Sequence, residues 1–216
     1  MRLLLTSASF TNEAIFQACE KLVGKKRHDI KVVTIEEAHK VETGDMTWFT
    51  EEKQILLDNF HSVTTLPLQE QPLAQIESLV QNADMIYCFG GNASYLTQVL
   101  EDTGFAQLLP QLLEEKVWVG SSAGSCVLGH EESERMRKEV FQEEVFTDHY
   151  LDLVPMLILP HYHGFIKYTD TDIEQEVASS DVSVYVLSDQ SAIQATGQPS
   201  DLAITPIGTD YQIHTV

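Results

Sequence analysis

Residues 120–124, Gly-Ser-Ser-Ala-Gly, carry the spacing Gly-x-Ser-x-Gly around a central serine, Ser122. The short, largely apolar run Lys116-Val117-Trp118-Val119 before this stretch predicts a buried strand, and residues 126–128 after it predict the first turn of a helix. Strand, sharp turn and helix in this order are the context of a nucleophile elbow. In such an elbow the turn pushes the central side chain out of the sheet, and small neighbours avoid collisions. The pattern predicts a nucleophilic hydroxyl at Ser122; the alternative is an ordinary Gly/Ser-rich loop.

A serine nucleophile needs a base to take its proton and a carboxylate to orient that base. The chain has eight histidines, and two of them, His161 and His163, follow an apolar strand and a proline. Catalytic groups of α/β sheets gather at such strand ends, so His161, the first of the pair, is the stronger candidate for the base. Asp189 follows the strand predicted at residues 182–187, at what we expect to be the same edge, and is the candidate carboxylate.

Backbone N–H groups that could stabilise an oxyanion are expected at two places. Gly91 lies where another predicted strand ends, and Ala123 directly follows Ser122. No cluster of His, Cys and carboxylates has zinc-ligand spacing, and neither GxGxxG nor GxxxxGKS/T occurs in the sequence. The sequence therefore predicts no metal and no cofactor.

The elements that must position these residues alternate between strands and helices over the first 130 residues. Apolar runs predict strands at residues 3–6, 30–35, 63–68, 84–89 and 116–119, with helices between them. This alternation indicates βαβ units, and hence an α/β fold with a doubly wound, mostly parallel sheet and helices on both faces. Short antiparallel edge strands are predicted near the C-terminus, at residues 192–195, 202–204 and 211–213. Because the sequence shows no repeats or long linkers, residues 1–216 are expected to form a single α/β domain.

Two segments have a less definite pattern. Residues 36–48 have no clear period and predict a loop or a broken helix. Thr50 is then expected to cap a helix with acidic residues in its first turn. Residues 131–149 are charged and lack a period, so we expect them to form either a helix or a mobile flap beside the site.

The charge of the chain limits its partners. Thirty-three acidic residues against thirteen Lys and Arg give the 216 residues a formal net charge of −20 at pH 7. Such a charge argues against nucleic acid and against anionic membrane surfaces as partners. The three cysteines have no CxxC spacing, and the chain shows neither a signal-peptide core nor an apolar run of about 18 residues. These features predict a cytoplasmic protein without a membrane span.

At four places the chain resembles motifs of the peptidase E (aspartyl dipeptidase) family of serine peptidases, whose fold is that of the class I glutamine amidotransferases. The matching blocks are residues 89–92 (Phe-Gly-Gly-Asn), 120–124 (Gly-Ser-Ser-Ala-Gly), 153–162 (Leu-Val-Pro, then Pro-His-Tyr) and 187–191 (Leu-Ser-Asp-Gln-Ser). They stand in the family's order and span nearly the whole chain. The resemblance implies a class I glutamine amidotransferase-like (flavodoxin-like) fold. It also implies a serine dipeptidase with a catalytic triad of Ser122 as nucleophile, His161 as base and Asp189 as acid.

The resemblance further implies a substrate and a set of residues that contact it. The expected substrate is a short peptide with a free N-terminus, and the expected oligomeric state is a monomer or a homodimer. Asn92, Tyr162 and Lys167 lie in or next to the matching blocks and are the candidate substrate-binding residues. The first block implies an oxyanion donor, for which Gly91 is the candidate.

Three departures from the family pattern affect the expected geometry and specificity. Ser121 stands where the family has Trp, and Asp189 stands where it has Glu, whose side chain is one methylene longer. The arginine that the family uses for aspartate specificity has no counterpart in residues 166–170. Lys167 is the candidate replacement, but a point charge does not reproduce a bidentate fork. Strict Asp-X cleavage is therefore not predicted, and a small polar or otherwise uncharged N-terminal residue is expected equally.

Four other interpretations are compatible with parts of the sequence. An α/β-hydrolase has the order Ser, acid, His, which here would be Ser122, Asp189 and His214. Amidotransferases carry cysteine at the elbow, and Cys126 lies close to it, although on the predicted helix, where packing in the core is expected. A cyanophycinase-like peptidase shares the fold and the elbow. A non-catalytic, metabolite-binding member of the fold is a further alternative, against which the presence of all three triad residues argues.

Overall fold

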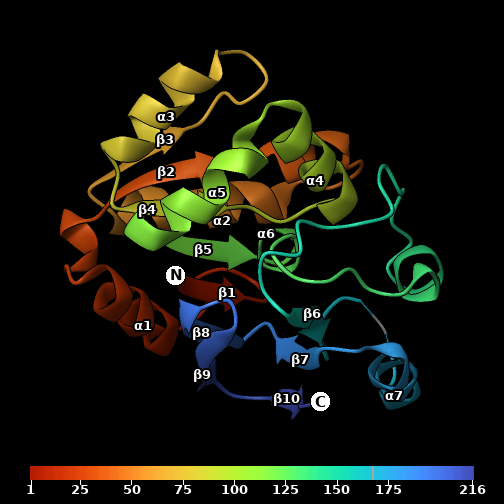
Figure 1. The fold of residues 1–216 in the computed structure, drawn as a ribbon. Helices are drawn as coiled ribbons and strands as arrows, with labels where there is room; N and C mark the ends of the chain where they lie inside the picture. Colours follow the sequence, from red (N-terminus) through yellow and green to blue (C-terminus); the bar gives the residue numbers. More distant parts are fainter. Residues whose placement is uncertain (167) are drawn as a thin grey trace.

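A seven-stranded sheet with the strand order β3-β2-β4-β5-β1-β8-β9 forms the centre of the molecule (Figure 1). The computed structural model describes residues 1–166 and 168–216. The strands of this sheet are β1 (Arg2–Thr6), β2 (Lys31–Ile35), β3 (Ser62–Thr65), β4 (Met85–Cys88), β5 (Val117–Ser121), β8 (Ser191–Gln198) and β9 (Asp201–Gly208). Strands β1 to β5 pair in parallel, whereas β8 pairs antiparallel with β1 and with β9. The predicted α/β fold with a mostly parallel sheet is confirmed.

Helices cover both faces of this sheet (Figure 1). They are α1 (Glu13–Val23), α2 (Thr47–Asn59), α3 (Leu73–Gln81), α4 (Ala93–Asp102), α5 (Phe105–Glu115), α6 (Ala123–Cys126) and α7 (Asp170–Ser179), with the short turns η1 (Arg27–Asp29), η2 (Glu37–Val41) and η3 (Met136–Val140). Neighbouring strand residues point to opposite faces, so Trp118 packs in the core under α3, α4 and α5, and Val119 packs in the core under α1 and α2. Among the described residues, the helices are too short or too polar to span a membrane.

A second, three-stranded sheet carries the segments that contain His161 and Asp189. Its strands are β6 (Met156–Tyr162), β7 (Ser183–Ser188) and β10 (Tyr211–His214), in the order β10-β7-β6. The predicted strand at residues 211–213 is indeed antiparallel and lies at an edge, but it pairs with β7 rather than extending the edge of β8 and β9. The reason is that β7 offers an open edge beside β6, and the alternation of side chains does not tell which edge a strand joins.

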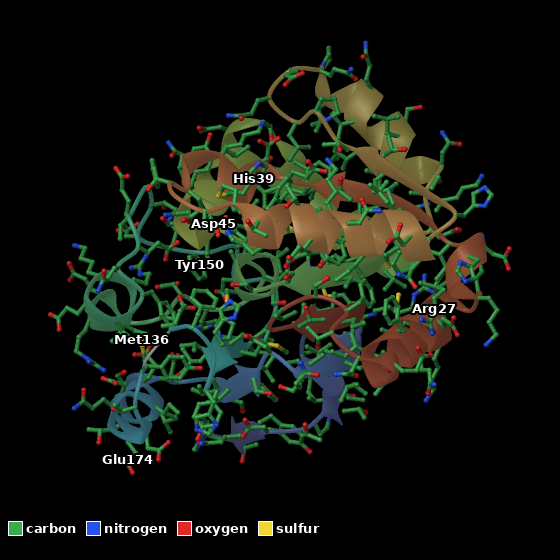
Figure 2. All side chains as sticks on the ribbon, turned by 180° about the vertical axis from the view of Figure 1, so that it is seen from behind. Arg27, His39, Asp45, Met136, Tyr150 and Glu174 are labelled. Carbon is green, nitrogen blue, oxygen red and sulfur yellow. The ribbon has the colours of Figure 1, made fainter. Side chains whose placement is uncertain are left out.

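The helix α2 begins earlier than the sequence suggests. The sequence predicts Thr50 as the cap, but the helix starts at Thr47, where Asp45 Oδ1 accepts hydrogen bonds from the backbone N–H (2.9 Å) and the hydroxyl (2.5 Å) of Thr47. Asp45 lies directly ahead of the helix (Figure 2). Its carboxylate satisfies a donor that the first turn would otherwise leave open, and Thr50 is left inside the helix. The preceding segment, predicted as a loop or a broken helix, contains the short turn η2.

Candidate active site

Ser122 lies at a sharp turn between β5 and α6. Its backbone has φ 49° and ψ −116°, a conformation that few residues other than glycine adopt. The flanking glycines are required by close contacts: a Cβ at Gly120 would lie 2.3 Å from the Gly124 carbonyl oxygen, and a Cβ at Gly124 would lie 2.1 Å from the Cys88 carbonyl oxygen. The turn has the geometry of a nucleophile elbow and places the Ser122 side chain at the carboxyl end of the parallel sheet.

His161 lies near the end of β6, beside a β-bulge. The register with β7 shifts between Leu159 and Tyr162, and His161 has φ 64°. Bulges re-aim side chains, and here the imidazole reaches from the second sheet to the elbow of the first. His161 Nε2 lies 2.9 Å from Ser122 Oγ, and the residue is only 6% exposed.

Asp189 follows β7 and lies on the other side of the same imidazole. Its Oδ1 is 2.7 Å from His161 Nδ1. Partial burial raises the pKa of the Asp189 carboxyl, but the hydrogen bonds from His161 and Ser7 outweigh it and hold the pKa below its ordinary value. The carboxyl is therefore ionised at neutral pH and acts as an acceptor, so the proton of the neutral imidazole belongs on Nδ1 and Nε2 accepts from the Ser122 hydroxyl.

Ser7 is a member of this network that the sequence analysis did not identify. Its hydroxyl accepts a hydrogen bond from the His161 backbone N–H (2.7 Å) and donates to Asp189 Oδ1 (2.8 Å). Ser7 is completely buried and directly follows β1, the strand between β5 and β8. One hydroxyl thus fixes both the backbone of the histidine and the carboxylate. The available signal was its place just past a strand of a parallel sheet, where functional groups gather.

The loop of Gly90 and Gly91 lies next to the elbow. A Cβ at Gly90 would be 3.1 Å from Ser122 Cβ, and Gly91 has φ +127° with its α-carbon packed against the Ala38 carbonyl. Ala123 is the first residue of α6, where a backbone N–H has no partner within its helix. These positions are consistent with an oxyanion site beside Ser122, and the roles of Gly91 and Ala123 stay predictions.

Asn92 holds the loop to the start of α4 and to the charged segment at residues 131–149. Its Oδ1 caps the helix by accepting from the Tyr95 N–H (2.7 Å), and its Nδ2 donates to the Glu144 carbonyl (2.7 Å). The side chain of Glu143 accepts from the Ala93 N–H (2.6 Å) at the same helix end. The segment is therefore docked beside the elbow through residues 143 and 144. The described bonds of Asn92 are to protein groups, and a contact with substrate stays a prediction.

Tyr162 and Lys167 are the other two candidate substrate-binding residues. The Tyr162 hydroxyl has partners outside the triad: it donates to Asp170 Oδ1 (3.2 Å) and accepts from Gln212 Nε2 (2.7 Å) on β10. Its role toward substrate stays a prediction. Lys167 lies outside the described residues.

The structure does not support the alternative candidates for the base, His214 and His163, or for the nucleophile, Cys126. His214 pairs with Val184, five residues before Asp189 and hence roughly 16 Å away along β7, which does not support the order Ser, acid, His. His163 Nδ1 lies 3.0 Å from Asp210 Oδ2 rather than facing Ser122. Burial raises the pKa of the Cys126 thiol well above its ordinary value, so Cys126 is a protonated core residue and not an activated nucleophile.

Ser121, which stands at the position of the family's Trp, takes part in a polar cluster behind the elbow. Its hydroxyl donates to Glu52 Oε2 (3.2 Å), and the Tyr87 hydroxyl donates to Glu52 Oε1 (2.7 Å). Burial raises the pKa of the Glu52 carboxyl to about 7. The hydroxyl next to the nucleophile is thus engaged by a carboxyl group that titrates near neutral pH.

Within residues 1–166 and 168–216, no group of three or more His, Cys, Asp or Glu side chains is arranged to hold a metal ion. The groups that the structure brings together at the elbow are the Ser122 hydroxyl, the His161 imidazole and the Asp189 carboxylate. These groups can move a proton from Ser122 to His161 while Asp189 stabilises the resulting imidazolium.

A nucleophile elbow on a mostly parallel α/β sheet, with an imidazole and a carboxylate in hydrogen-bond contact, is the arrangement of a serine hydrolase. The sequence profile of peptidase family S51 matches residues 3–203. The chain belongs to peptidase family S51 and is a serine peptidase.

Relatives and solved structures agree with this assignment. The chain is 28% identical over 141 residues to an uncharacterized peptidase of Listeria monocytogenes, covering 63% of this chain and 68% of the relative. It is 32% identical over 106 residues to an uncharacterized peptidase of Pasteurella multocida, covering 48% of this chain and 51% of the relative.

Two solved structures share the fold. A candidate peptidase E protein from Listeria monocytogenes EGD-e has a TM-score of 0.69 at 23% identity, with 100% of this chain and 98% of the other covered. A peptidase from an acI-B1 Actinobacterium has a TM-score of 0.65 at 18% identity, covering 100% of this chain and 87% of the other. The resemblance to peptidase E and to its fold is confirmed.

Proposed function

We propose that the chain is a serine dipeptidase in which Ser122, His161 and Asp189 form the catalytic triad. The observation that carries the proposal is the continuous set of contacts from Ser122 Oγ to His161 Nε2 (2.9 Å) and from His161 Nδ1 to Asp189 Oδ1 (2.7 Å). The position of Ser122 at a strained elbow adds support, because strained backbone conformations are found mainly where a side chain must be presented to a substrate.

In the first half of the proposed reaction, Ser122 Oγ attacks the carbonyl carbon of the peptide bond and His161 Nε2 takes the hydroxyl proton. The resulting oxyanion accepts hydrogen bonds from the N–H groups of Gly91 and Ala123. When the C–N bond breaks, His161 gives its proton to the leaving amine, and an acyl-enzyme remains on Ser122. Asp189 holds the imidazole in the productive tautomer throughout.

In the second half, a water molecule attacks the acyl carbon and His161 Nε2 takes one of its protons. The bond between the acyl carbon and Ser122 Oγ then breaks, and the same proton returns to Ser122. The products are the two parts of the peptide, one with a new carboxylate and one with a new amine.

The proposed substrate is a short peptide with a free N-terminus, as the resemblance to peptidase E implies. Asn92, Tyr162 and Lys167 remain the proposed contacts to it. Strict cleavage after aspartate is not part of the proposal, because residues 166–170 contain no arginine.

A panel of dipeptides tests this function. Wild type should hydrolyse at least part of the panel, Ser122→Ala should lose turnover, and Ser125→Ala should keep it. The control removes a buried hydroxyl of the same elbow, whose hydrogen bond goes to the Thr6 carbonyl (2.8 Å) and not to the triad. Turnover that survives in Ser122→Ala would refute the mechanism, and a wild type inactive on all dipeptides would refute the dipeptidase function.

A further inference from the structure

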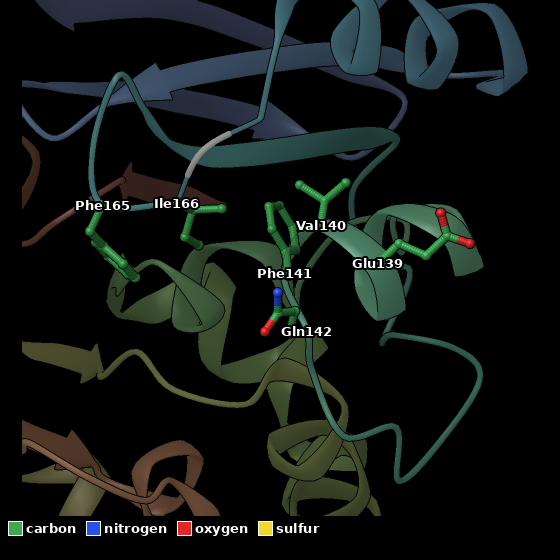
Figure 3. Close-up of a pocket in the computed structure, with 6 residues that line it drawn as sticks. All are labelled: Glu139, Val140, Phe141, Gln142, Phe165 and Ile166. Carbon is green, nitrogen blue, oxygen red and sulfur yellow. The ribbon is translucent and has the colours of Figure 1, made fainter.

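Two features of the structure have no part in the contacts of the triad. One is a pocket of about 460 Å³ lined by residues 139–142 and 165–166 (Figure 3), and none of these described lining residues belongs to the triad or to the proposed oxyanion site. The other is a group of buried hydroxyls around Glu52. This second feature is continuous with the nucleophile, because Ser121 is both a partner of Glu52 and the residue before Ser122.

The residues Glu52, Ser9, Tyr87 and Ser121 form what we call the Glu52 cluster. Glu52 lies on α2, and its Oε2 accepts a hydrogen bond from the Ser121 hydroxyl (3.2 Å). The Tyr87 hydroxyl lies 2.7 Å from Glu52 Oε1 and 2.6 Å from Ser9 Oγ. The three residues that carry the hydroxyls are at most 2% exposed. Because buried polar groups need partners within the protein, these hydroxyls depend on one another and on Glu52.

The three segments that meet at Glu52 each continue into the proposed site. The end of β5 leads directly into Ser122. The loop after β1 contains both Ser9 and Ser7, and β4 leads into the loop of Gly91. A change at the Glu52 carboxyl can therefore reach three parts of the site through short stretches of backbone. The connection to Ser122 is the shortest, since a single peptide bond separates it from a partner of Glu52.

The cluster has three contacts, and the number of protons available for them depends on the state of Glu52. When Glu52 is ionised, three hydroxyl protons fill the three contacts: Ser9 donates to Tyr87, and both Tyr87 and Ser121 donate to the carboxylate. Protonation of Glu52 adds a fourth proton, and one of the four then has no acceptor among these contacts. It also removes the charge that strengthens two of the bonds. The ionised state is thus the one in which Ser121 is held more firmly.

Both states of Glu52 occur near neutral pH, because burial raises the pKa of its carboxyl to about 7. Burial also raises the pKa of the Tyr87 hydroxyl and of the Cys88 thiol well above their ordinary values, so both of these neighbours on β4 stay uncharged. Other ionisable groups on α2 and η2 have partners of their own: Lys53 pairs with Glu36, Lys40 pairs with Glu37, and the His39 ring stacks on Phe49. Glu52 is therefore the group of this cluster that changes its charge near neutral pH.

We propose that Glu52 is a positioning residue for the nucleophile: its ionised carboxylate holds the elbow through the Ser121 hydroxyl, and its protonation weakens this hold and lowers turnover. The inference rests on the proposed dipeptidase function and adds a residue that acts through Ser121 rather than on the substrate.

The test compares kcat/KM of wild type and Glu52→Gln on the best dipeptide of the panel, from about pH 5 to about pH 9. Glutamine has nearly the shape of the neutral carboxyl group and does not ionise. Both proteins share the ionisation of His161, so the ratio of their kcat/KM values isolates the effect of Glu52. We expect the ratio of wild type to Glu52→Gln to rise from about one at the acid end to about tenfold at the alkaline end, because hydrogen bonds to charged groups are the stronger ones. The midpoint of the rise should lie near the pKa of Glu52, about 7.

The folding stability of the two proteins separates this role from a structural one. A buried carboxyl with a raised pKa costs stability once it ionises, so Glu52→Gln should be at least as stable as wild type at the alkaline end. Lower turnover in a protein that is not less stable is what a positioning role predicts. A variant that is both less active and less stable there would assign Glu52 to folding alone.

Glu36→Gln is the matched control. Glu36 Oε1 also accepts hydrogen bonds from two hydroxyls, those of Thr34 and Thr65 (both 2.7 Å). Its burial is outweighed by the hydrogen bonds from Lys53 and from these hydroxyls, which hold the pKa of Glu36 below its ordinary value, so it is ionised over the whole range. The ratio of wild type to Glu36→Gln should therefore not change with pH.

Ser121→Ala tests the route from Glu52 to the elbow. On this background, Glu52→Gln should produce no rise of the ratio with pH, because the connecting hydroxyl is gone. A rise that persists without Ser121 would overturn the proposed route. A ratio of wild type to Glu52→Gln that is constant with pH would overturn the positioning role itself.

A failure of the dipeptidase function can be told apart from a failure of this inference. If wild type cleaves no dipeptide, the rate at which a fluorophosphonate probe labels Ser122 replaces kcat/KM in the same comparison. Labelling with the expected rise would support the role of Glu52 although the substrate class is wrong, and labelling without the rise would overturn it. A wild type that neither cleaves dipeptides nor is labelled at Ser122 would refute both.

Discussion

Ser7→Ala is the substitution that most specifically probes how the triad is held together. The Ser7 hydroxyl contacts neither the Ser122 hydroxyl nor His161 Nε2; its described partners are the His161 backbone N–H (2.7 Å) and Asp189 Oδ1 (2.8 Å). Removing it leaves a buried N–H without its acceptor and leaves the carboxylate with one donor fewer. An unsatisfied buried donor costs about 1–3 kcal/mol. If that cost falls on the orientation of the imidazole in the transition state, kcat should decrease about 10- to 100-fold.

The assay separates this positioning role from a general loss of stability. Steady-state kinetics on the best dipeptide of the panel should show a lower kcat with little change in KM. The NMR resonance of the proton between His161 Nδ1 and Asp189 should move, because the carboxylate has lost a competing donor. Ser125→Ala is the matched control: it also loses one buried hydroxyl, but the Thr6 carbonyl keeps its hydrogen bond from the Ser122 N–H (3.1 Å).

We expect both serine variants to lose about 1 kcal/mol of folding free energy and only Ser7→Ala to lose turnover. Equal kcat values for Ser7→Ala and wild type, with an unchanged resonance, would refute the positioning role of Ser7. Equal losses of kcat in both variants would show that the effect comes from destabilisation.

Three further predictions concern the acid, a buried carboxyl group and the elbow. Asp189→Asn should reduce kcat by about 10³- to 10⁴-fold with a nearly constant KM, since an amide does not hold the required tautomer; a less than tenfold loss in steady-state assays would argue against Asp189 as the triad acid. Burial raises the pKa of the Glu132 carboxyl from 4.5, its ordinary value, to about 8 in the folded protein. Between these two pH values the unfolded chain has released the proton while the folded protein still holds it, so the folded state loses stability as the pH rises. The free energy of unfolding of Glu132→Gln relative to wild type, from urea titrations, should therefore increase by about 4 kcal/mol between these two pH values, and a constant difference would contradict the shift. Gly124→Ala places a Cβ 2.1 Å from the Cys88 carbonyl oxygen and should lower Tm by roughly 2–12 °C in calorimetry, whereas an unchanged Tm would mean that the turn adjusts.

The elements and the elbow were predictable because their signals are local. The apolar runs, the glycines around Ser122 and the order of the four blocks lie within short stretches of sequence, and the structure has strands and helices close to the expected places. The start of α2 was not predicted, because the bonds from Thr47 to Asp45 compete with an equally plausible cap at Thr50.

The contacts that complete the site depend on residues far apart in the chain. Ser7 and His161 are hydrogen-bonded although they lie 154 positions apart in the sequence. A polar residue after a strand does not by itself indicate which residue it will contact. The bulge at His161 arises in the pairing of β6 with β7, which periodicity does not describe. The pairing of β10 with β7 likewise depends on which strand edge is open.

The central claim is that Ser122 is a nucleophile activated by His161. The most direct test is to treat the folded protein with a fluorophosphonate probe and to locate the adduct by mass spectrometry of the digested protein. We expect a single adduct on Ser122 in wild type, strongly slowed labelling in His161→Ala and no labelling in Ser122→Ala. An adduct on Ser121, Ser125 or Cys126, or labelling that does not depend on His161, would contradict it.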